Sequence, residues 1–557
     1  MRRSFAGTVC QANDAKGTLP GACLGVASGV PNDASPPPRT FEDAYRNGAF
    51  SDLFSLPVHD LEAGLARPPV DDPEGLADAL LAQAEARGDH PAQHAAIERL
   101  RDPCTRVIVT GQQAGVLLGP LFTLSKAMTA LRLAAELDRD DRPVVAVFWV
   151  AAQDHDAAEI RETVLLGPQA EYRSVGLPFP EGQPAGRTPW ERAWSESLDA
   201  TLVDLYGDGP QAQEARAIVR AASEASSTIA DVFARLLSAV LGARGLIVLD
   251  PTQEAMARRF TPLLLHDAAD PAVGPSAIRE AGETLRARGF EPQLGRASDA
   301  TNLFLQRQGE PRRLLRFDGG AFHPDGVEQE RLTVADLHDV LERDPVAITP
   351  AAGLRPITQD AVLPTAAVVV GPGELRYFAQ LRGVYTHHGV PMPVVWPRAS
   401  VTLLEPPAVR VLAKHDLDAA TFQSNPEGVL EARLLALHGH AERFDASRRE
   451  LERVVEHLLD EVDAIDPTLQ GTVERGRDVL AMTVRRLETK VAAAAGLRDD
   501  VTREQFGRLR SLLLPGGGLQ ERTVSPFAYF ARFGVEPIVR RFESVPTSGA
   551  HALPIDP

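Results

Sequence analysis

Short, continuous apolar runs recur through the middle of this chain, and amphipathic segments separate them. A run of strand length without apolar–polar alternation is typical of a parallel strand that is covered on both faces. Between the runs, as in Leu121–Leu137, apolar residues recur every three or four positions, which predicts helices. This alternation predicts an α/β fold with a doubly wound parallel sheet. The expected strands are Val107–Val109, Val144–Val150, Gly245–Asp250, Val368–Val370 and Pro393–Trp396.

The apolar period changes from Leu430 onward, where apolar residues alternate at spacings of four and three. This heptad seam predicts an antiparallel helical hairpin whose first arm has about five heptads, roughly 50 Å at about 1.5 Å per residue. Asp466-Pro467 breaks the seam, since Asp caps a helix and Pro is tolerated in its first turn. We interpret the hairpin as an arm for self-association; the alternative is a helical pair folded back on its own core. The seam positions are Leu430, Leu434, Leu437, Ala441, Phe444, Arg448, Leu451, Val455, Leu458, Val462 and Ile465, then Val473, Leu480, Val484, Leu487, Val491 and Ala494.

These patterns divide the chain into four parts. The first is a tail, closed by a proline run, which we expect to be disordered and not a signal peptide. The α/β core follows, with two insertions packed on its sheet, then the helical arm, then a segment that returns to the core. The expected bounds are 1–40 for the tail, 41–425 for the core with insertions at about 165–240 and 265–350, 426–500 for the arm and 501–557 for the last segment.

The composition of the chain limits the classes of partner and the cellular compartment that we expect. The 557 residues carry a formal net charge of −18, which argues against a broad surface for nucleic acid or membrane, because both are anionic. No run of about 18 apolar residues is present, so no membrane span is expected. Three scattered cysteines, Cys10, Cys23 and Cys104, predict neither a disulfide framework nor a metal cluster, and they suit a reducing cytoplasm.

Two glycine-rich turns follow predicted strands, and each leads into an amphipathic helix. A strand, a tight glycine turn and an open helix N-terminus form a common cradle for phosphate or carboxylate. The first turn has neither the Lys-Ser/Thr ending of a P-loop nor a dinucleotide fingerprint, so it is equally a turn that needs glycine for positive φ. Its candidate binding residues are Gly111, Gln112, Gln113, Gly115, Gly119, Thr123 and Lys126, although a helix lysine can also simply be solvated.

An Asp-His-Asp triplet, Asp154, His155 and Asp156, follows the strand Val144–Val150. Open α/β sheets bind ligands at the carboxyl ends of their strands. A histidine between two acids could serve as a general base, orient a substrate amine or bind a metal. Without further ligands at fixed spacing we assign no metal site, and the structural alternative is a helix cap with a surface histidine.

The second glycine turn contains Gly371, Gly373 and Glu374, with Tyr377 one turn further along. Glu374 would lie in a first helical turn, where the helix dipole favours a carboxylate, or it could bind a substrate ammonium. Other polar residues near strand ends are candidates for substrate binding, because arginine can hold a carboxylate bidentately. They are Arg355 and Gln359, in a segment where Pro356 predicts a loop, Arg398 after a strand, and Gln520 and Arg522 after the Gly516–Gly518 turn.

Together these motifs resemble the bacillithiol-biosynthesis cysteine-adding enzymes, the BshC cysteine ligase family. The resemblance extends from about Phe41 to Phe542, and the motifs are specific only in combination. The matching stretches are Thr110-Gly-Gln-Gln-Ala-Gly115 with Gly119–Lys126, Val147–Asp156 with Glu159-Ile160, Leu354-Arg355-Pro356, Leu363-Pro364-Thr365, Gly371-Pro-Gly373-Glu374 with Tyr377, Met392-Pro393, Pro397-Arg398 and Gly518-Leu-Gln520-Glu521-Arg522.

The resemblance implies a Rossmann-like core, inserted connecting elements similar to those of nucleotidyltransferases and class I synthetases, and a coiled-coil arm that forms a homodimer. It also implies the last step of bacillithiol synthesis, in which the cysteine carboxyl is joined to the amine of glucosaminyl malate. This chain departs from the family pattern at Gln153, where we expect an acid, and at Thr365 and Ser525, where we expect Asn.

Amide formation from a carboxylate and an ammonium needs activation, so we expect ATP or another nucleotide, through an adenylate or an acyl phosphate. The first turn would hold nucleotide or malate, the Asp-His-Asp triplet would orient and deprotonate the amine, and Arg355, Glu374 and Arg398 would hold charged substrate ends. Any metal requirement stays open. Two alternatives remain: a nucleotidyltransferase-like enzyme that adenylates another acid, and a non-catalytic, nucleotide-binding coiled-coil dimer.

Overall fold

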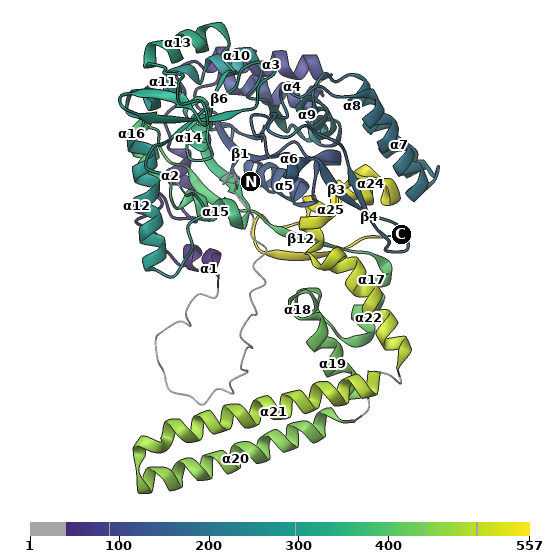
Figure 1. The fold of residues 1–557 in the computed structure, drawn as a ribbon. Coiled ribbons are helices and arrows are strands. Elements are labelled where there is room, and N and C mark those ends of the chain that lie inside the picture. The colour runs from purple at the N-terminus through teal and green to yellow at the C-terminus, as the bar shows by residue number, and fades with distance from the viewer. Residues whose placement is uncertain (1–39, 89, 296, 438, 497–498, 557) are drawn as a thin grey trace, which may run out of the picture. The chain divides into compact units, whose positions relative to one another are not determined.

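The computed structural model describes residues 40–556 apart from 89, 296, 438 and 497–498. The predicted tail therefore lies outside the described residues, except for Thr40. The described chain is an α/β protein built on a parallel central sheet, with smaller sheets and a long helical hairpin added to it (Figure 1).

All five predicted strands are present, and they form one five-stranded parallel sheet. In space the strands run β11-β10-β1-β2-β5, so the chain winds outward from β1 in one direction and then in the other. The direction reverses between β1 and β10, and this is where doubly wound sheets bind ligands. The strands are β1 (Arg106–Gln112), β2 (Val144–Val150), β5 (Ile247–Leu249), β10 (Thr365–Val370) and β11 (Val394–Pro397).

Successive strand residues point to opposite faces, and each face has its own hydrophobic core. Ile108 and Val369 belong to one core, whereas Val109 and Val368 belong to the other. This double burial explains why the strands are apolar throughout. The first core also contains η2 (Val116–Leu118), α5 (Phe122–Leu137) and the last helices of the chain, α24 (Phe527–Phe533) and α25 (Val535–Glu543).

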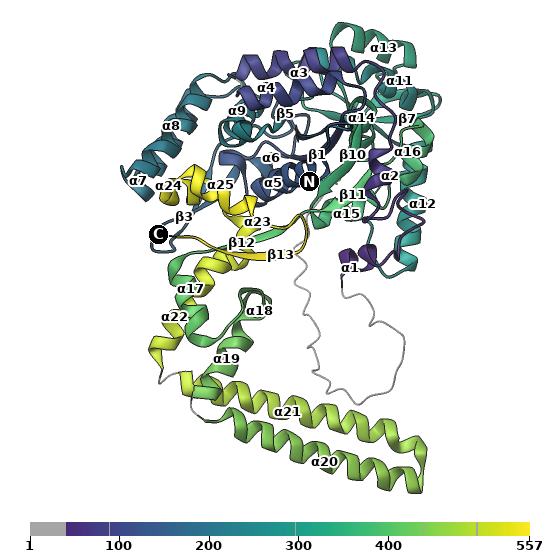
Figure 2. The same cartoon turned by 180° about the vertical axis from the view of Figure 1, so that it is seen from behind.

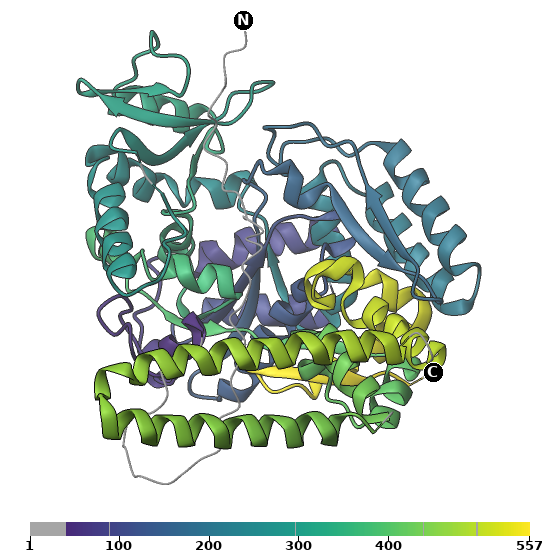
Figure 3. The same ribbon diagram turned by 60° about the horizontal axis from the view of Figure 1, so that its bottom comes forward.

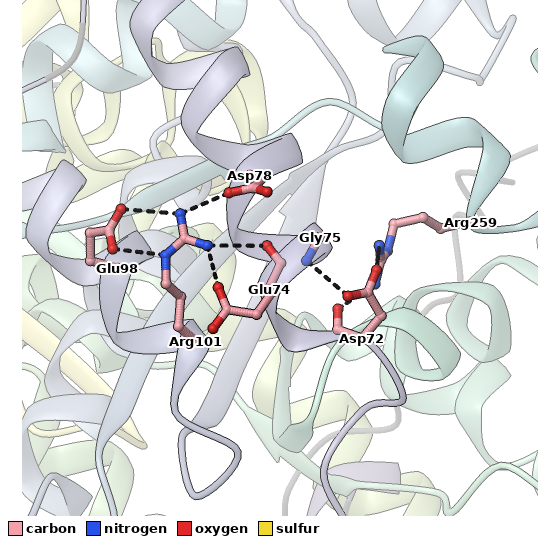
Figure 4. A network of polar contacts seen from close by, with 7 residues as sticks. All are labelled: Asp72, Glu74, Gly75, Asp78, Glu98, Arg101 and Arg259. Atoms are coloured by element: carbon pink, nitrogen blue, oxygen red, sulfur yellow. Dashed lines mark hydrogen bonds and ion pairs between the residues drawn. The ribbon is translucent and has the colours of Figure 1, made fainter.

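The N-terminal helices contribute to the second core, and ion pairs connect them with one another and with Arg259 (Figure 4). Arg101 binds Glu98 and Asp78, each at 2.8 Å, and Glu74 at 2.5 Å. Asp72 caps α3 (Pro73–Arg87) by accepting from the N–H of Gly75, and it forms an ion pair with Arg259, which follows α10 (Glu254–Arg258). The N-terminal helices are α1 (Phe41–Arg46), α2 (Leu61–Leu65), α3 (Pro73–Arg87), α4 (Pro91–Glu98) and η1 (Arg99–Arg101).

Two long segments separate the sheet strands. The first, between β2 and β5, contains an antiparallel β3–β4 hairpin and three longer helices. Its elements are α6 (Ala157–Ile160), β3 (Glu162–Leu166), β4 (Tyr172–Gly176), α7 (Arg192–Tyr206), α8 (Pro210–Glu224), α9 (Ile229–Leu241) and η3 (Gly242–Arg244).

The second segment, between β5 and β10, contains a four-stranded antiparallel sheet of order β8-β7-β6-β9. After β10, two helices and β11 complete the core. The elements are α11 (Thr261–Ala269), α12 (Val273–Ala287), β6 (Ala300–Leu305), β7 (Arg313–Asp318), β8 (Ala321–Pro324), α13 (Val334–Arg343), β9 (Ile348–Pro350), α14 (Arg355–Val362), α15 (Pro372–Phe378) and α16 (Arg382–His388).

Two short parallel strands, β12 and β13, bring the end of the chain beside the residues that follow β11 (Figure 2). Between them lie the arm and its flanking helices. The elements are β12 (Ser400–Leu404), α17 (Pro406–His415), α18 (Ala419–Ser424), α19 (Pro426–Leu437), α20 (Ala441–Ile465), η4 (Pro467–Leu469), α21 (Gln470–Gly496), α22 (Asp500–Leu513), η5 (Pro515–Gly517), α23 (Gln520–Thr523) and β13 (Ala550–Pro554).

The predicted hairpin is formed by α20 and α21, which lie side by side (Figure 3). Asp466 accepts from the N–H of Thr468 at 2.9 Å, as expected for the capped break. Within the seam Arg448 pairs with Glu488 of the other helix. One expectation was wrong: the first arm is not one helix, because α19 ends at Leu437 and α20 begins at Ala441. Gly439 between them has φ of 67°, which interrupts helical geometry.

Candidate active site

Lys126 of α5 connects the two glycine turns at the point where the strand order reverses. Its Nζ donates to Gly111 O at 3.0 Å and to Gln112 Oε1 at 2.8 Å in the first turn. It also forms an ion pair with Glu374 of the second turn, and only 3% of the Lys126 side chain is exposed. Burial lowers the pKa of Lys126, and the Glu374 carboxylate opposes that effect. Lys126 is therefore a buried partner of both turns and not a solvated helix lysine.

Different structural constraints require glycine at the positions of the first turn. A Cβ on Gly111 would lie 2.7 Å from Trp149 O, so Gly111 lets β1 and β2 approach closely. Gly119 has φ of 62° and follows Leu117 and Leu118, which also have positive φ. A Cβ on Gly115 would lie 3.1 Å from Gly119 Cα. The tight turn therefore needs glycine for conformation and spacing, as the structural alternative predicted.

The second turn places its carboxylate beside two cations. Glu374 Oε2 accepts from the N–H of Gly371 at 2.8 Å, which caps α15. A Cβ on Gly371 would lie 3.8 Å from Lys126 Cε and 3.9 Å from Arg398 Nε, so both cationic side chains converge on this glycine. Gly373 has open space around its Cα and needs no glycine for packing.

Several buried polar atoms around the two glycine turns have no hydrogen-bond partner among the described residues. They include Thr123 Oγ1, Gln113 Oε1 and Arg398 Nε. A buried polar group without a partner is costly, so such atoms usually indicate a missing ligand or water. A hydroxyl and a guanidinium nitrogen can donate to an anionic ligand, which suits the predicted cradle for phosphate or carboxylate.

The acid triplet joins the first turn through Asp154. Gln113 Nε2 donates to Asp154 Oδ2 at 2.7 Å, and the N–H of His155 donates to Oδ1 at 2.8 Å. Burial raises the pKa of Asp154, but the charge of Arg312 and the Gln113 hydrogen bond outweigh it, so the pKa is lowered. Asp154 is therefore a carboxylate at neutral pH and a poor proton acceptor.

His155 is held by Arg312, which precedes β7. Arg312 Nη1 lies 3.2 Å from His155 Nδ1, and its guanidinium lies 4.0 Å from the ring centroid of Phe304. A guanidinium only donates, so Nδ1 accepts and the neutral ring carries its proton on Nε2. Burial, followed by the Arg312 charge, lowers the pKa of His155. In this arrangement His155 offers an N–H to a ligand.

Two further acids lie close to Asp154 and His155: Asp156 is a helix cap, and Glu159 is a candidate general base. Asp156 caps α6 by accepting from the N–H of Ala158 at 3.1 Å, which is the structural role considered for it. Desolvation by the surrounding protein, then the charges of Asp154 and Asp156, raises the pKa of Glu159 to about 7. Glu159 is nevertheless an exposed residue, so it can exchange protons with water.

Arg355 and Gln359 lie on a helix, not in the loop that Pro356 predicted. Pro356 occupies the first turn of α14, where a proline breaks no hydrogen bond. Arg355 donates to Tyr377 Oη at 3.0 Å and to Gln359 Oε1 at 3.3 Å. Burial raises the pKa of Tyr377 to about 12, so the phenol stays protonated. The structure thus brings together one predicted residue from α15 and two from α14.

The C-terminal Gln520-Glu521-Arg522 motif contacts Arg398 through Glu521, which was not among the predicted site residues. Glu521 binds Arg398 bidentately at 2.7 Å and 2.7 Å, and both side chains are buried. Gln520 Oε1 accepts from the N–H of Leu403, and Gln520 Nε2 donates to Leu403 O and to Leu512 O. This geometry makes Gln520 a structural tie and does not support its predicted binding role. Arg522 is exposed on α23.

Three functional candidates were missed: Arg312, Glu159 and Glu521. Glu159 and Glu521 lay inside recognised motifs, where their spacing from Asp156 and Gln520 was a usable signal. Arg312 had no local signal, because it is 157 residues from His155 in the chain.

Fold and site together define a Rossmann-like α/β enzyme with an attached coiled coil. Residues 49–399 match the family model described as "Bacillithiol biosynthesis BshC, N-terminal Rossmann-like domain". Residues 401–549 match "Bacillithiol biosynthesis BshC, C-terminal coiled-coil domain". The chain belongs to the BshC family of bacillithiol biosynthesis.

Curated relatives agree, and each is named "Putative cysteine ligase BshC". A Thermus thermophilus protein is 41% identical over 463 residues, covering 82% of this chain and 89% of its own. The Salinibacter ruber protein is 33% identical, with coverage of 87% and 92%. The Geobacillus thermodenitrificans protein is 31% identical, with coverage of 86% and 90%. No helix among the described residues is long and apolar enough to cross a membrane.

Proposed function

We propose that this chain joins the carboxyl of cysteine to the amine of glucosaminyl malate, the amide-forming last step of bacillithiol synthesis. The observation that carries the proposal is the position of Lys126, whose ammonium holds the first glycine turn against Glu374 of the second. The relatives' names support cysteine as one substrate, and the family description supports a place in bacillithiol biosynthesis. A thiol substrate also suits the reducing cytoplasm in which we place the reaction.

The bond to be formed requires an activated carboxyl. The amine nitrogen attacks the carbonyl carbon, the C–N bond forms, the activating group leaves, and a proton leaves the nitrogen. ATP would supply the activation when bound. The buried Thr123 hydroxyl and Arg398 Nε, both without a partner among the described residues, fit an anionic ligand at the glycine turns. They do not choose between a nucleotide phosphate and the carboxylates of malate.

The polar residues suggest separate roles. Glu159, with a pKa raised to about 7, accepts the amine proton, because a base with a pKa near the working pH transfers protons most effectively. His155 donates from Nε2 to a substrate oxygen, since Arg312 occupies Nδ1. Asp154 stays ionised and orients the amine. The second turn and Arg355 hold the other charged substrate ends.

The decisive assay incubates the full chain with cysteine, glucosaminyl malate and ATP and measures the amide product by mass spectrometry. We expect product, with AMP and pyrophosphate or ADP and phosphate showing how the carboxyl is activated. Glu159→Gln and His155→Ala should each lower turnover by about 10²–10⁴-fold, whereas the exposed His59→Ala should leave it unchanged. Full turnover in both site variants would contradict the assigned roles.

Two outcomes would favour the alternatives. Pyrophosphate exchange that depends on an acid other than cysteine would indicate a nucleotidyltransferase with another substrate. Nucleotide binding without turnover, together with normal bacillithiol levels in a deletion strain, would indicate a non-catalytic binding dimer.

We also propose a homodimer formed through the arm. In the α20–α21 hairpin Val455 is 3% exposed, but other seam residues remain open to solvent: Ile465 is 78% exposed, Leu487 51% and Leu458 46%. A second copy would cover these side chains, and the coiled-coil family model supports such an association.

A further inference from the structure

Away from the candidate active site, three histidine rings form a compact triangle. His266 comes from α11, and His387 and His388 are the last two residues of α16. The ring centroid of His266 lies 5.0 Å from that of His387 and 5.0 Å from that of His388, and the centroids of His387 and His388 are 4.8 Å apart. None of the motifs identified in the sequence includes these residues.

The nitrogen atoms of the triangle have the spacing of metal ligands. One ring nitrogen from each histidine lies within 4.8 Å of the other two, and His266 Nδ1 is 3.0 Å from His388 Nδ1. In a tetrahedral site with metal–nitrogen bonds of about 2.0–2.1 Å, neighbouring ligand atoms are about 3.3 Å apart. Small side-chain adjustments would therefore bring the three nitrogens to ligand geometry.

A buried carboxylate fixes the orientation of His388. Its Nε2 lies 3.2 Å from Asp267 Oδ1, and the two side chains are each 1% exposed. With the proton of His388 held on Nε2 by Asp267, its Nδ1 lone pair points toward His266. Metal-binding histidines characteristically donate their other N–H to a carboxylate in this way.

The surroundings favour a cation. His387 Nε2 is buried and has no hydrogen-bond partner among the described residues. His266, His387 and His388 lie in the last turns of α11 and α16, where helix carbonyls carry partial negative charge.

We propose that His266, His387 and His388 bind a divalent first-row transition-metal ion, with Asp267 positioning His388. Imidazole ligands suit Zn²⁺, Co²⁺, Ni²⁺ or Cu²⁺ and disfavour Mg²⁺ and Ca²⁺, which require oxygen ligands. The exposed His266 leaves the fourth coordination position open to water. The ion would fasten α11 to α16, independently of the proposed ligase reaction.

The test uses the full chain, stripped of metal with a chelator and dialysed. Isothermal titration with Zn²⁺ should show one tight site, and Co²⁺ should give the visible absorption of a tetrahedral complex. His266→Ala should abolish both signals, whereas His59→Ala, another exposed histidine, should retain them. Asp267→Asn should weaken Zn²⁺ binding about 10- to 100-fold, the usual effect of losing such a positioning carboxylate.

Several results would overturn this proposal: no stoichiometric Zn²⁺ binding by the stripped chain, equal binding by His266→Ala, or Co²⁺ spectra typical of all-oxygen coordination. Because His266 is exposed, its substitution is not expected to prevent folding. Metal binding is measured without turnover, so a failed ligase assay would leave this result interpretable.

Discussion

The ammonium of Lys126 and the carboxylate of Glu374 form an ion pair between two segments that lie far apart in the chain. Lys126 belongs to the helix after the first glycine turn, and Glu374 to the helix after the second. The pair exists because β1 and β10 are neighbours in the sheet, although β2 and β5 lie between them in the chain.

This pair should be energetically coupled. Lys126→Met removes the partner of a partly buried carboxylate, and we expect a loss of about 2–4 kcal/mol of unfolding free energy. Lys126→Met combined with Glu374→Gln should be less destabilised than the sum of the single variants by about 0.5–3 kcal/mol. Urea unfolding of the four chains measures the coupling. Strict additivity would show that the two side chains do not interact.

The bidentate pair of Arg398 and Glu521 should matter more for stability than surface pairs. Glu521→Gln leaves a buried guanidinium without its counter-charge, at an expected cost of about 3–5 kcal/mol. The control is Glu196→Gln, which breaks the exposed i,i+4 pair with Arg192 and should cost at most about 0.5 kcal/mol. Thermal unfolding compares them, and equal shifts would contradict the structural role.

Glu159 should make both stability and turnover depend on pH. Its pKa is raised from 4.5 to about 7, so the folded chain holds a proton that the unfolded chain releases earlier. Stability from this group therefore falls as pH rises from 4.5 to about 7. Relative to wild type, Glu159→Gln should gain stability over that window.

In the amide-forming assay, wild-type turnover should rise through the same pH window as Glu159 becomes a carboxylate and can accept a proton. Glu159→Gln should lack this rise. A wild-type profile that is retained in the variant would assign the titration to another group, and unchanged stability across the window would contradict the raised pKa.

Two glycines of the candidate site should differ sharply in their tolerance of alanine. Gly111→Ala places a Cβ 2.7 Å from Trp149 O, and we expect a loss of about 1–3 kcal/mol. Gly373→Ala meets open space in a helix and should gain up to about 1 kcal/mol. Denaturant midpoints compare the variants; a tolerated Gly111→Ala would show that β1 and β2 can separate locally.

Dimer formation should depend on the solvent-exposed seam. The double variant Leu458→Glu and Leu480→Glu introduces charge where a second copy would pack, so light scattering should report a monomer. Val273→Glu is the control, because Val273 is 42% exposed but lies outside the arm. A dimer that persists in the double variant would place the interface elsewhere.

Much of the fold was predictable because local sequence carries its physical signal. Val144–Val150 must be apolar throughout to be buried on both faces, so the strand was visible before its neighbours were known. The break at Asp466 was equally local. The interruption at Gly439 was not anticipated, because an isolated glycine within a heptad pattern is often tolerated.

The candidate site was predictable only in part. Asp154 and Glu374 follow strand ends, and Lys126 lies on the helix after the first glycine turn. Parallel strands bring their ends to one edge of the sheet. Which side chains then contact one another was not encoded locally. Arg312, the residue before β7, fixes the tautomer of His155, and Glu521 binds Arg398 from the last part of the chain.

The sequence by itself determined the five strands of the central sheet and the heptad hairpin, because each depends on residue spacing within a short segment. It also indicated the family, through motifs that are specific only in combination. Tertiary structure alone decided the strand order, the link from Lys126 to Glu374, the structural use of Gln520 and the histidine triangle. These depend on contacts between residues far apart in the chain, whose partners are set by packing and burial and not by local pattern.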